Sequence, residues 1–289
     1  MSIFVLPTGS ATWPLDPVIA LGLFATGAAY IGADRRVRRE HGGHSLPRSR
    51  LRFFLLGILA VFVALETPID TGAASSFAIH MVQHLLLTMV AAPLFVLGTP
   101  VTLSLMASSG ATRRRLLAAT KSRPVRFLTN PIVAWSLFMT VLWASHVTDL
   151  YELTLGNQAI HALEHLAYLT TAVLFWIPVV GLDPVASGLS YPARILYLFL
   201  AMPAMAFLGL ALFSADHVLY ATYARVEGVA PALADQRIAG ALMWTGTMFF
   251  IVPALAFVLL DWMRADEREA RRVDARLLRT PVPTEGASP

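Results

Sequence analysis

Two pairs of histidines with the same spacing are the residues in this sequence best suited to chemistry. His80 and His84 are four residues apart, and so are His161 and His165. On an α-helix, four residues correspond to about 400° of rotation and about 6 Å of rise, so both rings of a pair lie on one face. Neutral imidazole is a ligand for copper and zinc. Each pair is therefore predicted to offer two metal ligands from one rigid helix.

Other side chains are expected to support the two pairs. Glu164 shares a helix face with His161 and His165, so it is a candidate ligand or an acceptor for an imidazole N–H group. Thioether sulfur would favour Cu(I), although methionine in an apolar segment is usually core filler. The methionines in question are Met81, Met202, Met205 and Met243. The chain has no cysteine, which excludes thiolate ligands and disulfides.

The elements that position these residues are predicted to be transmembrane helices. Hydrophobic residues make up 56% of the 289, charged residues only 14%, and the mean hydropathy is +0.64. A helix crosses about 30 Å of hydrocarbon with about 20 residues. Seven apolar runs are long enough to cross the membrane, some of them with the help of tilt. The predicted fold class is therefore all-α, an integral membrane bundle of seven transmembrane helices. The runs are 16–33, 51–67, 76–98, 131–147, 160–180, 193–215 and 237–262.

The basic residues predict the orientation of this bundle. With seven spans, 20 of the 22 lysines and arginines fall on one side, and only Arg225 and Arg237 on the other. Positive residues favour the cytoplasm, so the N-terminus is predicted outside and the C-terminus inside. The same bias explains the sequence pI near 9.8 without nucleic acid. The predicted organisation is a short external segment (1–15), a transmembrane domain (16–263) and a cytoplasmic tail (264–289) that is helical, then disordered.

This topology gathers six of the eight histidines at the outer membrane face. They are His80, His84, His146, His161, His165 and His217, whereas His41 and His44 fall in a cytoplasmic turn. Such agreement would be uncommon if each were assigned to a side independently. The alternative is that these histidines only join helices by hydrogen bonds or sit at the wet interface. Two further expectations concern the spans: Pro93 should kink the third, and 218–234 should be the longest outer loop.

Several motifs resemble the seven-helix CtaG family of cytochrome c oxidase assembly factors. They include His80-Met-Val-Gln83-His84, Ala92-Pro93-Leu, Leu97-Gly98-Thr-Pro100, His161-Ala-Leu-Glu164-His165 and Asp235-Gln236 followed by Met243-Trp244. The resemblance implies a bacterial inner-membrane protein that matures haem-copper oxidase and handles copper at the outer face. Its partners would be oxidase subunits or other copper-handling proteins, together with the lipid bilayer and, in a homo-oligomer, further copies of the chain. We therefore expect His80, His84, His161 and His165 as main ligands, His146 and His217 as auxiliary ones, tuned by Glu164 and Asp235.

Two other classes of function are consistent with the same residues. Ser76-x-x-x-His80 and the histidine pairs are similar to intramembrane zinc hydrolases of the ceramidase type, in which Glu164 or Asp235 would be catalytic. Two facing pairs would also hold b-type haem for electron transfer. Copper is the favoured cofactor, with zinc and haem b as alternatives, and the non-enzymatic function is favoured over the hydrolase.

Overall fold

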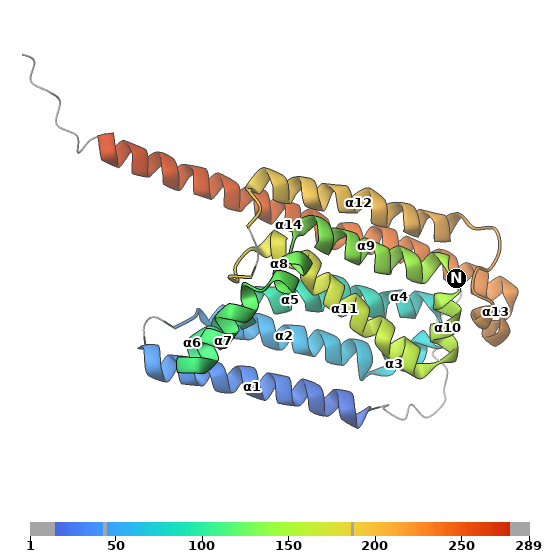
Figure 1. The fold of residues 1–289 in the computed structure, drawn as a ribbon. Coiled ribbons are helices and arrows are strands. Elements are labelled where there is room, and N and C mark those ends of the chain that lie inside the picture. The colour runs from blue at the N-terminus through green and yellow to red at the C-terminus, as the bar shows by residue number, and fades with distance from the viewer. Residues whose placement is uncertain (1–14, 43–44, 186–187, 278–289) are drawn as a thin grey trace, which may run out of the picture.

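The computed structural model describes residues 15–42, 45–185 and 188–277, and their regular structure is entirely helical (Figure 1). The long helices lie roughly parallel and form one bundle. In chain order the helices are α1 (Pro17–His41), α2 (Arg48–Leu65), α3 (Pro68–Ala73), α4 (Phe77–Leu85), the π-helix η2 (Leu86–Ala91), α5 (Ala92–Leu97), α6 (Pro100–Ala107), α7 (Gly110–Thr120), α8 (Arg123–Leu128), α9 (Pro131–Val147), α10 (Leu150–Gly156), α11 (Gln158–Val180), α12 (Tyr191–Ser214), α13 (Ala221–Glu227) and α14 (Val229–Leu277).

Five segments of the described chain are long and apolar enough to cross a membrane. Their bounds are Pro17–Glu40, Phe77–Ala107, Gln158–Val180, Tyr191–Ser214 and Val229–Ala275. A sixth results if α9 and α10, which are bent by 74° at their junction, form one span. Helix α2 falls outside this count because three arginines lie in its first five residues. The multispanning all-helical class is thus confirmed, while the count of seven and the orientation stay predictions.

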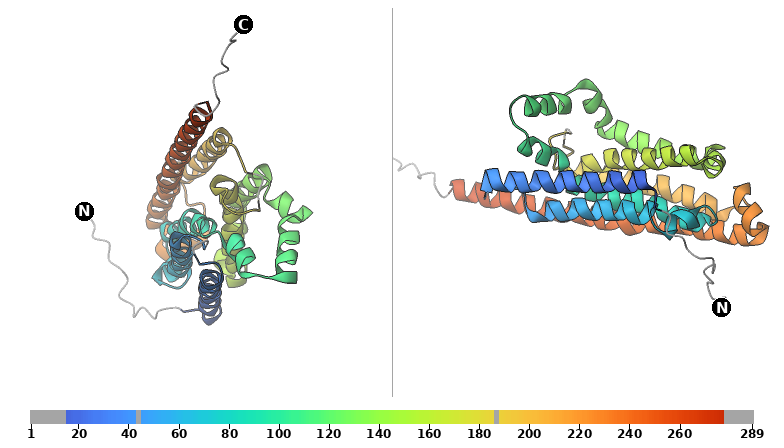
Figure 2. Two further views of the ribbon diagram at one scale, coloured as in Figure 1. Left: turned by 90° about the vertical axis from the view of Figure 1, so that its left-hand side faces the viewer. Right: turned by 90° about the horizontal axis from the view of Figure 1, so that it is seen from below.

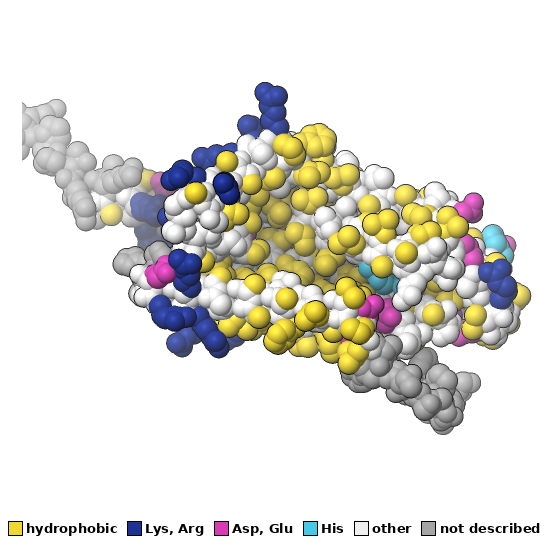
Figure 3. Space-filling model, turned by 60° about the horizontal axis from the view of Figure 1, so that its bottom comes forward, with side chains coloured by type: hydrophobic (Ala, Val, Ile, Leu, Met, Phe, Trp, Pro, Cys, Tyr) yellow, Lys and Arg dark blue, Asp and Glu magenta, His cyan; other side chains and the backbone are white. Residues whose placement is uncertain are grey.

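Charged side chains divide the bundle into two unlike ends. Figure 3 shows lysine and arginine side chains gathered mainly at one end, and histidine and acidic side chains toward the other. We call the first the arginine end; α2 and α12 start there. The second, the histidine end, contains the starts of α4 and α11. An apolar hollow lies between the two ends on the face shown in Figure 3, as expected of a surface that contacts lipid.

Helices α12 and α14 pack closely along much of their length (Figures 1 and 2). The close approach depends on Gly209 and Gly240, which face each other. A Cβ added to Gly240 would lie 2.6 Å from the carbonyl oxygen of Gly209 and 2.5 Å from the backbone nitrogen of Phe213. Small residues at such positions let transmembrane helix backbones touch.

The last helix is longer than the sequence pattern predicts. Helix α14 runs unbroken for 49 residues, from Val229 to Leu277, and its end projects beyond the bundle (Figures 1 and 2). The predicted tail helix is therefore the continuation of the last span, and the helix also begins before Asp235. The predicted disordered end, the last ten residues (280–289), and nearly all of the predicted external segment 1–15 lie outside the described residues.

The third predicted span contains a change of helix type next to Pro93. The π-helix η2 ends at Ala91, just before this proline. Proline lacks the N–H group that would bond the carbonyl of Met89, and π-helical turns are a recognised site of local helix deformation. One carbonyl of this turn, that of Thr88, accepts a hydrogen bond of 3.0 Å from the indole Nε1 of Trp176 on α11. This hydrogen bond links the third predicted span to the fifth.

Candidate metal centre

The N-terminus of α4 is held in place by two side chains. Ser76 precedes the helix, and its hydroxyl accepts from the backbone N–H of Ile79 (3.2 Å). Asp235 on α14 accepts from the backbone N–H of Phe77 (2.6 Å) and from the Ser76 hydroxyl (3.0 Å). These bonds satisfy amide groups that a helix start leaves free. They also tie α4 to α14 immediately before His80.

His80 and His84 follow on the buried face of α4. Both side chains are shielded from solvent, with exposures of 0% and 5%. Their Nε2 atoms lie 3.0 Å apart. Two nitrogens bound tetrahedrally to one ion at about 2.0–2.1 Å would be about 3.3 Å apart. The separation therefore suits a shared metal ion.

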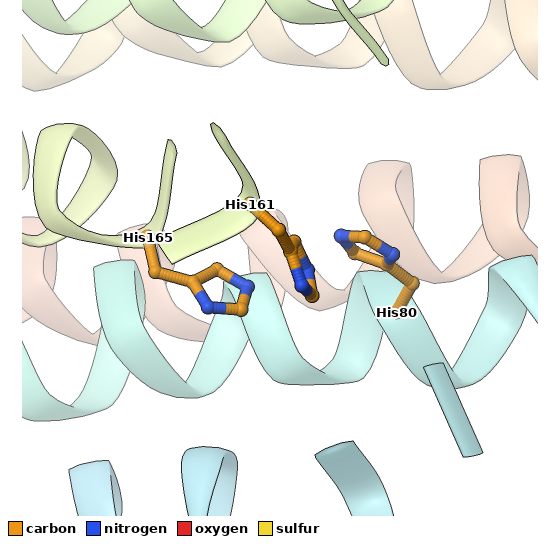
Figure 4. Close-up of side chains that lie close together, drawn as sticks. All are labelled: His80, His161 and His165. Atoms are coloured by element: carbon orange, nitrogen blue, oxygen red, sulfur yellow. The ribbon is translucent and has the colours of Figure 1, made fainter. Parts of the chain in front are cut away.

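Helix α11 brings the second pair and Glu164 to the same place. Asn157 caps its start by accepting from the N–H groups of Ala159 and Ile160. The ring of His161 lies 5.1 Å from that of His80 between centroids, and the ring of His165 lies 5.5 Å from that of His84. Figure 4 shows His161 and His165 approaching His80 from the opposite helix.

Two sets of possible ligand atoms lie within 4.8 Å of one another in the described chain. One set is His80, His161 and His165, and the other is His80, His84 and Glu164. The prediction that the two histidine pairs share one site thus has a structural basis. His80 belongs to both sets and lies at the centre of what we call the histidine cluster, which comprises His80, His84, His146, His161, Glu164 and His165.

His146, in the last turn of α9, adds a third helix to the cluster. Its Nδ1 lies 2.8 Å from the carbonyl oxygen of Leu142, which can only accept, so Nδ1 carries the proton. The lone pair is then on Nε2, which is buried without a protein partner. Its ring centroid is 6.5 Å from that of His84. This hydrogen bond fixes the tautomer in the way found for metal-binding histidines.

The segment 218–234, which the sequence predicts to be a loop, supplies a tyrosine that orients His80. Within predicted loop 218–234 the chain forms α13, and its Tyr223 is 2% exposed. The Tyr223 hydroxyl donates to the carbonyl of Ala73 (3.1 Å), so its oxygen can accept from Nδ1–H of His80 (3.3 Å). Burial raises the pKa of this hydroxyl, which keeps it protonated at neutral pH. This bond leaves the Nε2 lone pair of His80 directed toward His84.

Aromatic side chains close the cluster on the side of α10 and α13. The rings of Phe77, Tyr151, Tyr220 and Tyr223 pack against one another at centroid distances from 4.3 to 6.5 Å. Tyr168 on α11 stacks against His84 at 4.3 Å and shares a hydrogen bond with Ser145. Sequence analysis gave no role to Tyr168 or Tyr223. Only the fold brings them to the histidines, because Tyr168 lies in the middle of predicted span 160–180 and Tyr223 within predicted loop 218–234, with no spacing that links either to a histidine pair.

Unpartnered polar atoms test whether a metal fits this cluster. Buried polar groups in folded proteins nearly always have a hydrogen-bond partner, and an unsatisfied one costs about 1–3 kcal/mol. Ten buried side-chain atoms of the described chain lack one, and six of them belong to the cluster: Nδ1 of His84, Nε2 of His146, His161 and His165, and both carboxylate oxygens of Glu164. A cation bound among them would satisfy lone pairs that the protein leaves free. The donor set therefore fits a metal ion.

The remaining predicted site residues lie elsewhere. His217 is exposed and pairs with its neighbour Asp216 (2.8 Å), so it is not part of the cluster. The predicted topology grouped His217 with the other histidines only because they share a membrane depth. Asp235 caps α4, as described above, and acts on the cluster through His80's helix. Ser76, the serine of the hydrolase interpretation, is engaged by the same cap.

A larger cavity connects the cluster with the surface at the histidine end. It has a volume of about 820 Å³ and lies between α1, α3 and α11. His161 and His165 line it together with Asp16, Asp70 and Gln158. Figure 3 shows imidazole side chains at the end of the hollow, beside acidic ones. A cation thus has a polar approach to the α11 histidines, away from the aromatic side chains.

Fold and site together define a multispanning helical membrane protein with a buried, histidine-rich centre near one end. The chain belongs to the family described as cytochrome c oxidase caa3 assembly factor (Caa3_CtaG), whose family model matches residues 28–265. This match confirms the resemblance seen in the histidine motifs.

Relatives with similar sequences occur in mycobacteria. The chain is 30% identical over 272 residues to an uncharacterised protein of Mycobacterium leprae, and 29% identical over 272 residues to uncharacterised proteins of Mycobacterium bovis and Mycobacterium tuberculosis. Each alignment covers 91% of this chain but 41% of the relative. The chain thus spans about two fifths of the length of the curated relatives it matches. No solved structure matches it significantly.

Proposed function

We propose that this protein binds copper at the histidine cluster and hands it on during assembly of a haem-copper cytochrome c oxidase. The assignment to oxidase assembly is supported by the family, which is one of cytochrome c oxidase assembly factors. The observation that carries the copper assignment is the convergence of buried, unpartnered imidazole nitrogens from three helices. Copper is the oxidase metal that imidazole binds most readily among divalent first-row ions.

In this proposal the four histidines of α4 and α11 are the main ligands. His80 and His84 present Nε2 atoms 3.0 Å apart, and His161 and His165 line the cavity through which an ion arrives. His146 is an auxiliary ligand, and Glu164 offsets part of the positive charge. Asp235 and Tyr223 position His80. The partner is an oxidase subunit or another copper-handling protein.

The proposed location is the outer leaflet side of a bacterial cytoplasmic membrane. The arginine end faces the cytoplasm by the positive-inside rule, which places the cluster near the outer face. Because the sequence contains no cysteine, single cysteines introduced at exposed positions can test this orientation. A membrane-impermeant maleimide should label His217→Cys in intact cells and Ser109→Cys only after lysis. The opposite pattern would reverse the orientation.

Metal analysis of detergent-purified protein tests the copper assignment. The full chain is loaded separately with copper and zinc, washed and analysed for metal content together with an absorption spectrum. We expect copper at near-unit stoichiometry or above, and no Soret band. Tightly held zinc without copper would favour the hydrolase, and a Soret band would favour haem b.

Deletion of the gene tests the assembly function. Membranes of the deletion strain should contain oxidase with reduced copper content and activity, restored by the wild-type gene and not by a His80→Ala/His84→Ala gene. Restoration by the double variant would separate the oxidase function from the cluster.

A further inference from the structure

A second, smaller cavity adjoins the histidine cluster inside the bundle. Its volume is about 20 Å³, enough for a single water-sized particle. Residues of α4, η2, α9, α11, α12 and α14 form its walls. The lining residues with donor atoms of interest are Met81 and His84 from α4, His146 from α9, Met205 from α12 and Met243 from α14.

Both histidines of this cavity have an unpartnered nitrogen, but a neutral imidazole has only one lone pair, so His84 cannot bind a metal ion on both sides at once. His84 and His146 are 5% and 6% exposed, and Nδ1 of His84 and Nε2 of His146 are buried without partners. His84 directs its other nitrogen, Nε2, toward His80. The ring of His84 therefore stands between the histidine cluster and the small cavity.

The hydroxyl groups around the cavity are already engaged. Thr88 donates to the carbonyl of His84 (2.7 Å), and Thr247 donates to the carbonyl of Met243 (2.6 Å). Tyr168 shares its hydrogen bond with Ser145. The atoms left to bind a metal ion while Nε2 of His84 serves the histidine cluster are thus Nε2 of His146 and the thioether sulfurs.

We propose that this cavity is a separate binding site for Cu(I), deeper than the histidine cluster, with Nε2 of His146 and the sulfur atoms of Met81, Met205 and Met243 as its donors. Thioether sulfur and neutral imidazole form a soft, uncharged donor set that selects Cu(I) over zinc and other hard or borderline ions. Three buried methionines meeting at one gap differ from ordinary core filling, since protein interiors are close-packed. The inference rests on the proposed function for the supply of copper.

Silver(I) and zinc distinguish this site from the histidine cluster. Silver(I) serves as a redox-inert probe for Cu(I), and zinc as a probe for the nitrogen and oxygen donors. The full chain in detergent is titrated with each ion. The wild type should bind one more equivalent of Ag(I) than of Zn(II). A triple variant, Met81→Leu/Met205→Leu/Met243→Leu, should bind Ag(I) at least tenfold more weakly at that equivalent and keep its zinc.

A control variant shows whether replacing any three buried or partly buried methionines weakens Ag(I) binding. Met89 and Met139 are similarly buried, and Met202 is partly buried, but none of these lines the cavity. The control Met89→Leu/Met139→Leu/Met202→Leu should bind both ions as the wild type does. Leucine for methionine nearly conserves volume, so both triple variants should fold, as thermal melting in detergent will verify.

X-ray absorption on the Cu(I)-loaded wild type gives a readout without any substitution. Sulfur bound to copper supports the site, whereas a spectrum with nitrogen and oxygen alone overturns it. Unchanged Ag(I) binding by the cavity variant overturns it as well, while zinc or copper held by the histidines would leave the proposed function standing. No metal binding by the wild type would overturn both.

Discussion

The Nε2 atoms of His80 and His84 lie 3.0 Å apart inside the bundle, one helical turn from each other on α4. The Tyr223 hydroxyl oxygen can accept a hydrogen bond from Nδ1–H of His80, so the lone pair of His80 is on Nε2. A lone pair at this distance from a second imidazole has two uses. Either it accepts a hydrogen bond from Nε2–H of His84, or both rings bind one cation. The second use is the one we propose, and it would give partners to the neighbouring nitrogens that lack them.

Removing both histidines of α4 should abolish copper binding at the cluster. We expect His80→Ala/His84→Ala to lose copper to below a tenth of the wild-type stoichiometry at equal free copper, because both sets of convergent ligand atoms contain His80. Metal analysis after gel filtration in detergent measures the loss, and an unchanged elution profile shows that the fold persists. Retained stoichiometric copper would contradict the site.

His217→Ala is the matched control for this experiment. The predicted topology puts His217 at the same membrane face, but the structure exposes it beside Asp216. We expect copper stoichiometry and affinity unchanged in His217→Ala. A loss equal to that of the double variant would mean that metal binds at the surface.

Replacing Tyr223 by phenylalanine should weaken copper binding without removing the site. The change deletes the acceptor for Nδ1–H of His80 and leaves that group buried. Partners of metal-bound histidines typically contribute 10- to 100-fold in affinity. A competition titration against a chelator of known affinity measures the shift. Tyr30→Phe, which loses a buried hydroxyl bonded to the Gly98 carbonyl far from the cluster, should leave the affinity unchanged.

The histidine pairs were predictable because they depend on local geometry. Four-residue spacing fixes both rings on one helix face whatever the rest of the chain does, and the positive-inside bias places both pairs at one membrane depth. The family resemblance added the expectation of a shared site. What sequence order does not determine is which helices are neighbours, so the contact between α4 and α11 had to come from the structure.

His217 and Asp235 show, in opposite ways, what the sequence alone could not predict about the site. Membrane depth alone grouped His217 with the other histidines, but its side chain faces away from the bundle. Asp235 was expected to tune imidazoles directly, and it instead caps a helix 158 residues away in sequence. Tyr223 was not identified because its segment was predicted to be a loop, whereas the structure forms the short helix α13 there, packed against α14 and α10.

Removing the Asp235 carboxylate should destabilise the start of α4 and, through it, the cluster. Asp235→Ala leaves the Phe77 and Ala78 amide groups without their acceptor, and loss of a capping side chain costs about 0.5–2 kcal/mol. We expect a lower melting temperature in detergent and a weaker, still stoichiometric, copper complex. Asp149→Ala removes an acid that makes no capping bond at α10 and should have neither effect. Full loss of copper in Asp235→Ala with an unchanged melt would identify Asp235 as a ligand instead.

Adding one methyl group to Gly240 should separate α12 from α14. The new Cβ would lie 2.6 Å from the Gly209 carbonyl oxygen, a backbone atom that no side-chain rotation can move. Forcing a helix pair apart in this way costs about 1–3 kcal/mol, so Gly240→Ala should lower the melting temperature and the yield of folded protein. Gly22→Ala on α1 has no atom within 4 Å of the added carbon. Since alanine favours helix by about 0.5–1 kcal/mol over glycine, that variant should be as stable as the wild type or more so. Equal stability of the two variants would mean that α12 and α14 do not approach as closely as their glycines allow.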